Sequence, residues 1–214
     1  MAARRLPPVI PASLLSLQLI CEYRAYLEAL EGGRTSPGLA RLVARRVIVE
    51  RRGSKAARVS VVGEVMGVPL AASPDMALLG SDGRVTHLVK ASLRKPPRRL
   101  RSDMVYLATA ALLLENEGML AENAVLASVS ASREDLLRKT LERIASEGVV
   151  KPHKSPGLTV YTEIYDRSRA LEALSRLLEV WKGERPPKAS PSPGLCSGCR
   201  FSEACEYSAA SPKA

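Results

Sequence analysis

The sequence predicts an α/β or α+β protein, because candidate helices and candidate strands alternate along its 214 residues. Apolar residues at helical spacing mark the helices, and short β-branched runs mark the strands. The composition is that of a globular protein, with 46% hydrophobic and 25% charged residues. We find no apolar run of the ~18 residues that a membrane span needs. The N-terminus also lacks the apolar segment of a signal peptide, so we expect a cytoplasmic protein.

The N-terminal part of the chain predicts two helices and then two strands. Apolar residues at helical spacing favour a first helix over 13–30, capped by its serine and ended by a Gly-Gly pair. A second helix is expected to begin near Ser36, with proline in its first turn. The runs 47–50 and 59–62 then predict strands on either side of a basic turn.

The middle of the chain contains the clearest hairpin signal. Strands over 76–79 and 84–90 are expected to pair across a Gly-Ser-Asp-Gly turn, because Asp-Gly suits a tight hairpin. A basic segment with two prolines, 94–101, follows as a loop. A long apolar helix is then predicted over about 104–117, capped by Ser102 and Asp103.

The C-terminal half predicts a strand at 125–129, a helix from 132, a strand at 158–164 and a helix over 169–182. A Pro-rich linker over 186–194 follows the last helix. The chain therefore divides into one domain, that linker and a cysteine-bearing tail. We place the domain at 1–185 and the tail at 195–214, docked back on the N-terminal helix.

Charge points to a polyanionic partner. Lysine and arginine exceed aspartate and glutamate by ten, and the isoelectric point is about 9.8. Such an excess favours nucleic acid, although solubility alone is the alternative explanation. The chain has one glutamine and two asparagines, and this scarcity of thermolabile amides is typical of a hot-growing, archaeal type of source.

Four cysteines form the most specific pattern. Cys196, Cys199 and Cys205 follow a Cys-x2-Cys-x5-Cys spacing, and Cys21 is the only other cysteine. Without a secretory signal, metal binding is favoured over disulfides. Four thiolates suit a [4Fe–4S] cluster or zinc, and unligated thiols are the third alternative. Structural zinc usually shows two tight pairs, so the one-plus-three arrangement favours the cluster.

The cysteine pattern resembles a known family. The segments Cys-Glu-Tyr-Arg-Ala-Tyr-Leu at 21–27 and Leu-Cys-Ser-Gly-Cys-Arg-Phe-Ser-Glu-Ala-Cys at 195–205 look like those of the RecB-like iron–sulfur nucleases. Within these, the chain is similar to the fourth CRISPR-associated protein family. The resemblance implies a PD-(D/E)XK restriction-endonuclease fold, a central mixed sheet flanked by helices, with a four-cysteine iron–sulfur cap. It also implies a metal-dependent DNA exonuclease acting on ends or single strands in spacer acquisition or repair, with DNA and other CRISPR adaptation proteins as partners.

The resemblance also implies a catalytic site. In the family, an Asp on one strand and Glu-x-Lys on the next hold Mg²⁺ or Mn²⁺ and position the attacking water. Pro74-Asp75 matches the first element and Lys90 matches the lysine, on the same face of its strand as position 88. Position 88, where the glutamate would stand, is Leu88.

Other departures concern the following helix and the histidines. The family's Gln-x-x-x-Tyr is absent, since the matching helix reads Tyr-Leu-Ala-Thr-Ala from Tyr106 and the only glutamine, Gln18, is elsewhere. The early-helix histidine is missing as well, because the chain has only His87, of the wrong parity to face the site, and His153. Acidic residues that could substitute for the missing glutamate are Glu50, Glu64, Asp103 and Glu115.

The basic segment follows the lysine-bearing strand, so it is a candidate for tracking a nucleic-acid backbone. Its cations are Arg94, Lys95, Arg98, Arg99 and Arg101. A solvated loop is the alternative. For the whole protein, three functions stay open: a nuclease of reduced activity, a catalytically inactive DNA- or protein-binding member of the same fold, and a winged-helix DNA-binding protein built on 132–164.

Overall fold

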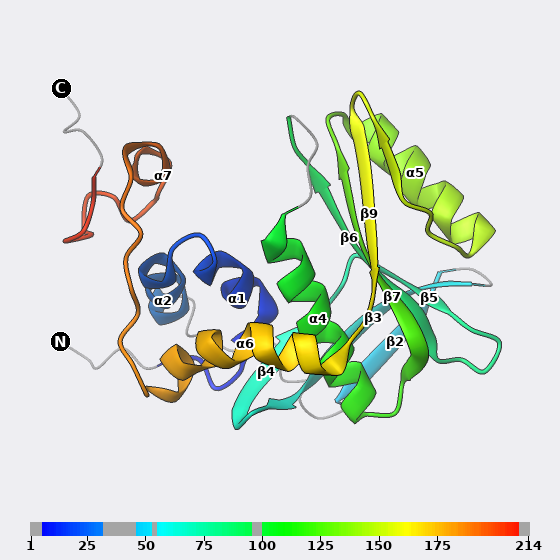
Figure 1. The fold of residues 1–214 in the computed structure, drawn as a ribbon, viewed down its shortest axis with the longest axis horizontal. Helices are drawn as coiled ribbons and strands as arrows, with labels where there is room; N and C mark the ends of the chain where they lie inside the picture. Colours follow the sequence, from blue (N-terminus) through cyan, green and yellow to red (C-terminus); the bar gives the residue numbers. More distant parts are fainter. Residues whose placement is uncertain (1–5, 32–45, 53–54, 96–99, 210–214) are drawn as a thin grey trace.

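The computed structural model of the protein describes residues 6–31, 46–52, 55–95 and 100–209. These residues form a mixed nine-stranded sheet with helices on both faces (Figure 1). The strand order is β1-β4-β3-β5-β6-β7-β9-β8, and β2 pairs with β3 beside that path. The expected α/β class with a mixed sheet is therefore confirmed. Among the described helices, none combines the length and apolarity needed to cross a bilayer.

The described elements alternate along the chain. The strands are β1 (Ile10–Pro11), β2 (Val47–Arg51), β3 (Ala56–Val65), β4 (Val68–Ala72), β5 (Met76–Leu79), β6 (Val85–Leu93), β7 (Leu120–Ala131), β8 (His153–Ser155) and β9 (Leu158–Ile164). The helices are α1 (Ala12–Gln18), α2 (Glu22–Glu31), α4 (Arg101–Asn116), α5 (Glu134–Glu147), α6 (Arg167–Lys182) and α7 (Pro193–Ser197).

Strands β4 and β5 pair in succession with the same edge of β3. Val61 of β3 pairs with Ala72, and Ala57 pairs with Ala77, so residues 73–75 lie between the two ladders. The strand beyond β4 is β1, and the strand beyond β5 is β6. The polar turn that carries Asp75 therefore lies between the β4 and β5 ladders, where the pairing of β3 is interrupted.

The segment β6-α4-β7 supplies the centre of the domain. Strands β6 and β7 are parallel, and α4 crosses between them. On one face, Leu88 and its neighbour Leu126 belong to a cluster that buries the apolar side chains of α4, α1 and α6. On the opposite face, Val89 and Ala127 pack under α5. Since α4 is apolar nearly all round, it lies buried in the core rather than on the surface.

Several expected elements are confirmed and others differ. The hairpin of β5 and β6 forms as predicted, with an antiparallel register. The single helix expected over 13–30 is wrong, because the chain breaks between α1 and α2. The helix expected from Ser36 lies outside the described residues. The hairpin of β8 and β9 joins the main sheet beside β7, so α5 is an insertion between sheet strands rather than part of a separate winged-helix unit.

Candidate metal centre and polar site

The face of the sheet beneath α4 changes from apolar to polar along β6 and β7. Neighbouring pairs run from Leu88 and Leu126, through Lys90 and Ser128, to Ser92 and Ser130, and alternation puts all of them on the α4 side. The apolar pair is buried in the core. The polar pairs extend to the N-terminal end of α4. The residues at this step in polarity form what we call the polar site: Asp75, Lys90, Asp103, Tyr106 and Ser128.

The structure brings Asp75 and Lys90 together, as the resemblance implies. The Lys90 Nζ lies 3.0 Å from the Asp75 Oδ2, with the two side chains 29% and 39% exposed. The same carboxylate oxygen accepts the Ala91 backbone N–H at 2.8 Å. The Asp75 backbone N–H donates to the Val89 carbonyl. Asp75 is therefore tied to β6 through both its backbone and its side chain.

Tyr106 positions the turn that carries Asp75. Its hydroxyl donates to the Ser73 carbonyl at 2.6 Å and accepts the Ser73 backbone N–H at 2.9 Å. Its ring centroid lies 5.0 Å from the Lys90 Nζ, within the range of a cation–π contact. Burial raises the pKa of this hydroxyl, so it stays a neutral donor at physiological pH. From the sequence, Tyr106 was interpreted only as a departure from the family's Gln-x-x-x-Tyr pattern. The available signal for its role was an aromatic residue on the helix that follows the Ser-Pro-Asp segment in the chain.

The position expected for the second carboxylate is apolar in structure as well as in sequence. Leu88 is fully buried in the core under α4. Among the proposed substitutes, Glu50 and Glu64 are exposed side chains on β2 and β3. Glu115 lies near the far end of α4, where its carboxylate accepts hydrogen bonds from Tyr165 and Arg167.

Asp103 is the one proposed substitute that belongs to the polar site, and both of its carboxylate oxygens already accept hydrogen bonds. Its two oxygens accept the Arg94 guanidinium at 2.7 and 2.8 Å, and one also accepts the Ser128 hydroxyl at 2.8 Å. The Asp103 side chain is only 6% exposed and that of Arg94 is 21% exposed. This buried bidentate pair turns Arg94 inward, so its guanidinium is engaged by the protein itself.

The remaining cations of the basic segment differ in position. Lys95 and Arg101 are exposed. Arg98 and Arg99 lie outside the described residues. Lys95 and Arg133 share the lining of a shallow, open hollow where β6 ends and α5 begins. His87 is on the opposite face of the sheet from the polar site, and burial of its ring lowers the pKa of the imidazole.

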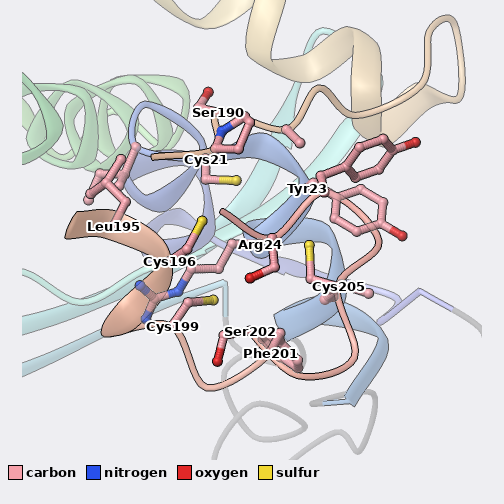
Figure 2. Close-up of a pocket in the computed structure, with 16 residues that line it drawn as sticks. Cys21, Tyr23, Arg24, Ser190, Leu195, Cys196, Cys199, Phe201, Ser202 and Cys205 are labelled. Atoms are coloured by element: carbon pink, nitrogen blue, oxygen red, sulfur yellow. The ribbon is translucent and has the colours of Figure 1, made fainter. Parts of the chain in front are cut away.

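All four cysteines line a single pocket between the N-terminal helices and the C-terminal tail (Figure 2). Cys21 lies in the break between α1 and α2, Cys196 in α7, and Cys199 and Cys205 in the turns that follow. The Cys21 N–H bonds to the Leu17 carbonyl, and its own carbonyl accepts the first hydrogen bond of α2. The helix break thus exposes this thiol to the pocket instead of leaving it along a continuous helix.

The thiols are chemically suited to a soft metal group. All four are free rather than joined in disulfides. A backbone hydrogen bond with Ala209, followed by one with Ser192, lowers the pKa of the Cys196 thiol, which favours the thiolate that binds metal. Within the described residues, however, no three Cys, His, Asp or Glu side chains are close enough together to hold one ion. Four free thiols therefore share one pocket, and among the described residues they are not gathered into a single-ion site.

Ion pairs hold the segment that follows α6, including the tail, against α2. The Arg185 guanidinium forms a bidentate pair with Glu22 at 2.6 and 2.7 Å, and the Lys188 N–H donates to the same carboxylate. Farther along, Arg200 pairs with Glu28 at 2.6 Å. The rings of Tyr23 and Tyr207 meet edge to face at 5.0 Å. These contacts place residues of the tail beside α2.

These pairs predict acid sensitivity of the docked tail. The hydrogen bond from Arg185 lowers the pKa of Glu22 below its ordinary value of 4.5. A lowered folded-state pKa contributes stability above the ordinary value, and that stability is lost as the pH falls through the lowered value. We expect trypsin to cleave the 186–194 linker slowly at neutral pH in a Glu22-containing protein and faster in Glu22→Gln. At pH values well below 4.5 Glu22 is protonated, so the contact should be lost in both proteins alike; an unchanged trypsin rate in Glu22→Gln would contradict this role.

Comparison of the sequence with models of known protein families finds no match, and no curated protein matches it significantly.

Proposed function

We propose that this protein is an iron–sulfur member of the RecB-like nuclease fold that binds DNA and has lost most or all of its hydrolytic activity. The observation that carries the proposal is the state of the one matched carboxylate. Asp75 is bonded to the Lys90 ammonium and to a backbone N–H, and Leu88 is where its partner acid would stand. A neutralised single carboxylate is a poor ligand for a hard divalent cation.

The buried pair of Arg94 and Asp103 supports the same conclusion. Phosphodiester hydrolysis by this fold relies on divalent metal to stabilise the charge that develops at phosphorus. Asp103 could assist Asp75 only after releasing Arg94 and Ser128, and breaking a buried bidentate pair costs several kcal/mol. Lys90 and Arg94 thus already pair with Asp75 and Asp103, the two acids of the polar site.

Net charge and its placement support DNA as the ligand. The chain carries an excess of ten positive charges. Lys95, Arg101 and Arg133 are exposed beyond the polar end of the sheet. Arg98 and Arg99 belong to the same basic segment in the sequence. Cations gathered on one part of a surface attract a phosphate backbone regardless of base sequence. On the resemblance to the CRISPR-associated family, the context we propose is spacer acquisition in the cytoplasm, with adaptation proteins as partners.

The test compares cleavage with binding. Purified protein is incubated with end-labelled single-stranded and double-stranded DNA in Mn²⁺ or Mg²⁺, alongside Asp75→Ala. We expect DNA binding by the wild type and no cleavage above the level of the variant. Mn²⁺-dependent cleavage that disappears in Asp75→Ala would show instead an active exonuclease with a relocated second carboxylate.

The basic segment has its own test in the salt dependence of binding. In Arg98→Ala/Arg99→Ala, the slope of log affinity against log salt should fall by about one to two, since each lost phosphate contact removes roughly 0.7–0.9. The control is Arg138→Ala/Arg143→Ala, which removes two arginines from α5 on the other face of the sheet. An equal slope in the wild type and in Arg98→Ala/Arg99→Ala would show that the basic segment does not contact DNA phosphates.

A further inference from the structure

The cysteine pocket contains a cation with an unsatisfied donor. Arg24 belongs to α2 and lines the pocket together with all four cysteines. Figure 2 shows its side chain reaching toward Cys196 and Cys199. Its Nε atom is buried and, within the part of the chain that the structure describes, has no hydrogen-bond partner. A buried N–H without an acceptor is costly, so this geometry indicates a missing acceptor.

The nearest acid does not fill that place. The Glu28 Oε1 lies 3.7 Å from the Arg24 Nε, beyond hydrogen-bonding distance. The other oxygen of Glu28 is 2.6 Å from the Arg200 guanidinium. Glu28 is therefore bound mainly to Arg200, which does not line the pocket, whereas Arg24 lines it together with the four cysteines.

We infer that Arg24 donates a hydrogen bond to the sulfur-ligated iron group of this pocket and raises its reduction potential. The inference rests on the proposed iron–sulfur function. Hydrogen bonds to cluster sulfurs and local charge are two of the factors that set such potentials. Reduction by one electron from an external low-potential donor such as dithionite adds one negative charge beside Arg24. The guanidinium stabilises the more negative state more strongly, so its presence favours reduction.

The experiment compares three variants purified without oxygen. Arg24→Met keeps an apolar stem and removes the charge, and Arg24→Lys keeps the charge. Arg138→Met removes the same charge from α5, where Arg138 forms an exposed pair with Glu142. Iron and acid-labile sulfide are quantified, and the potential is measured by optical titration with dithionite and redox mediators.

In Arg24→Met, the equilibrium constant for reduction should fall about tenfold, a shift of about 59 mV for a one-electron couple. Arg24→Lys should recover part of the shift, and Arg138→Met should equal the wild type. Loss of iron from Arg24→Met but not from Arg24→Lys also supports the role, because the charge is then needed to retain the group.

Two results would overturn the inference separately from the function. Full iron content with an unchanged potential in Arg24→Met would remove the role of Arg24 and leave the iron–sulfur proposal standing. Loss of iron from both Arg24 variants would show that only packing matters at this position. A wild-type protein without iron, or with stoichiometric zinc, would overturn both this inference and the iron–sulfur function.

Discussion

Asp103→Ala should lower the free energy of unfolding by about 3 kcal/mol, because it leaves the partly buried Arg94 guanidinium without its bidentate partner. The change also removes the acceptor of the buried Ser128 hydroxyl. Urea unfolding followed by circular dichroism measures the difference. The double variant Asp103→Ala/Arg94→Met should recover part of the loss, since the uncompensated charge is gone.

Asp135→Ala is a closely matched control for Asp103→Ala. Asp135 also lies in the first turn of a helix and also forms a bidentate pair, with Arg133 at 2.7 and 3.0 Å. Both partners are exposed, at 71% for Arg133 and 43% for Asp135. Water screens such pairs, so this variant should unfold at the wild-type urea concentration. Equal unfolding midpoints for the two alanine variants would mean that burial of Asp103 contributes nothing.

On the proposed iron–sulfur function, Cys21→Ala should abolish iron binding and lower the thermal midpoint as much as Cys199→Ala does. The reason is that all four thiols line one pocket and would hold one group, and a group bound only by the folded state stabilises that state. Iron content, visible absorbance and differential scanning calorimetry are the measurements. The control is Ser202→Ala, which changes another residue of the pocket lining without removing a thiol. A Cys21→Ala protein with full iron content and unchanged midpoint would limit the centre to the tail.

Local signals account for the parts of the fold that the sequence predicted well. The β5–β6 hairpin follows from its Asp-Gly turn, and α4 follows from its long apolar run. Strand β4 was missed because Pro69 interrupts its pattern, although the Met66-Gly67 turn before it was a usable signal. Both of these turn residues have positive φ, at 52° and 83°. Strand β1 pairs only two residues with β4, so its existence depends on tertiary contact that no local pattern encodes.

The candidate site shows the same division between local and long-range information. Alternation correctly put Leu88 and Lys90 on one face, and the structure joins Asp75 to Lys90. Arg94 was assigned to phosphate contact on charge alone. Its bidentate pair with Asp103 depends on the angle at which α4 follows β6, and a charge count holds no information on that angle. The helix break at Cys21 was hidden because apolar spacing continues through it.

The ion pairs that join the C-terminal segment to α2 bear on how the pocket would be loaded. A zinc finger folds only when its metal arrives, because nothing else brings its ligands together. Here the pairs of Glu22 with Arg185 and of Glu28 with Arg200 join the two ends of the chain through side chains that are not thiols. These contacts offset part of the entropy of closing that long loop. On the proposed iron–sulfur function, protein that has lost its iron by oxidation should therefore be reconstituted with iron and sulfide without unfolding.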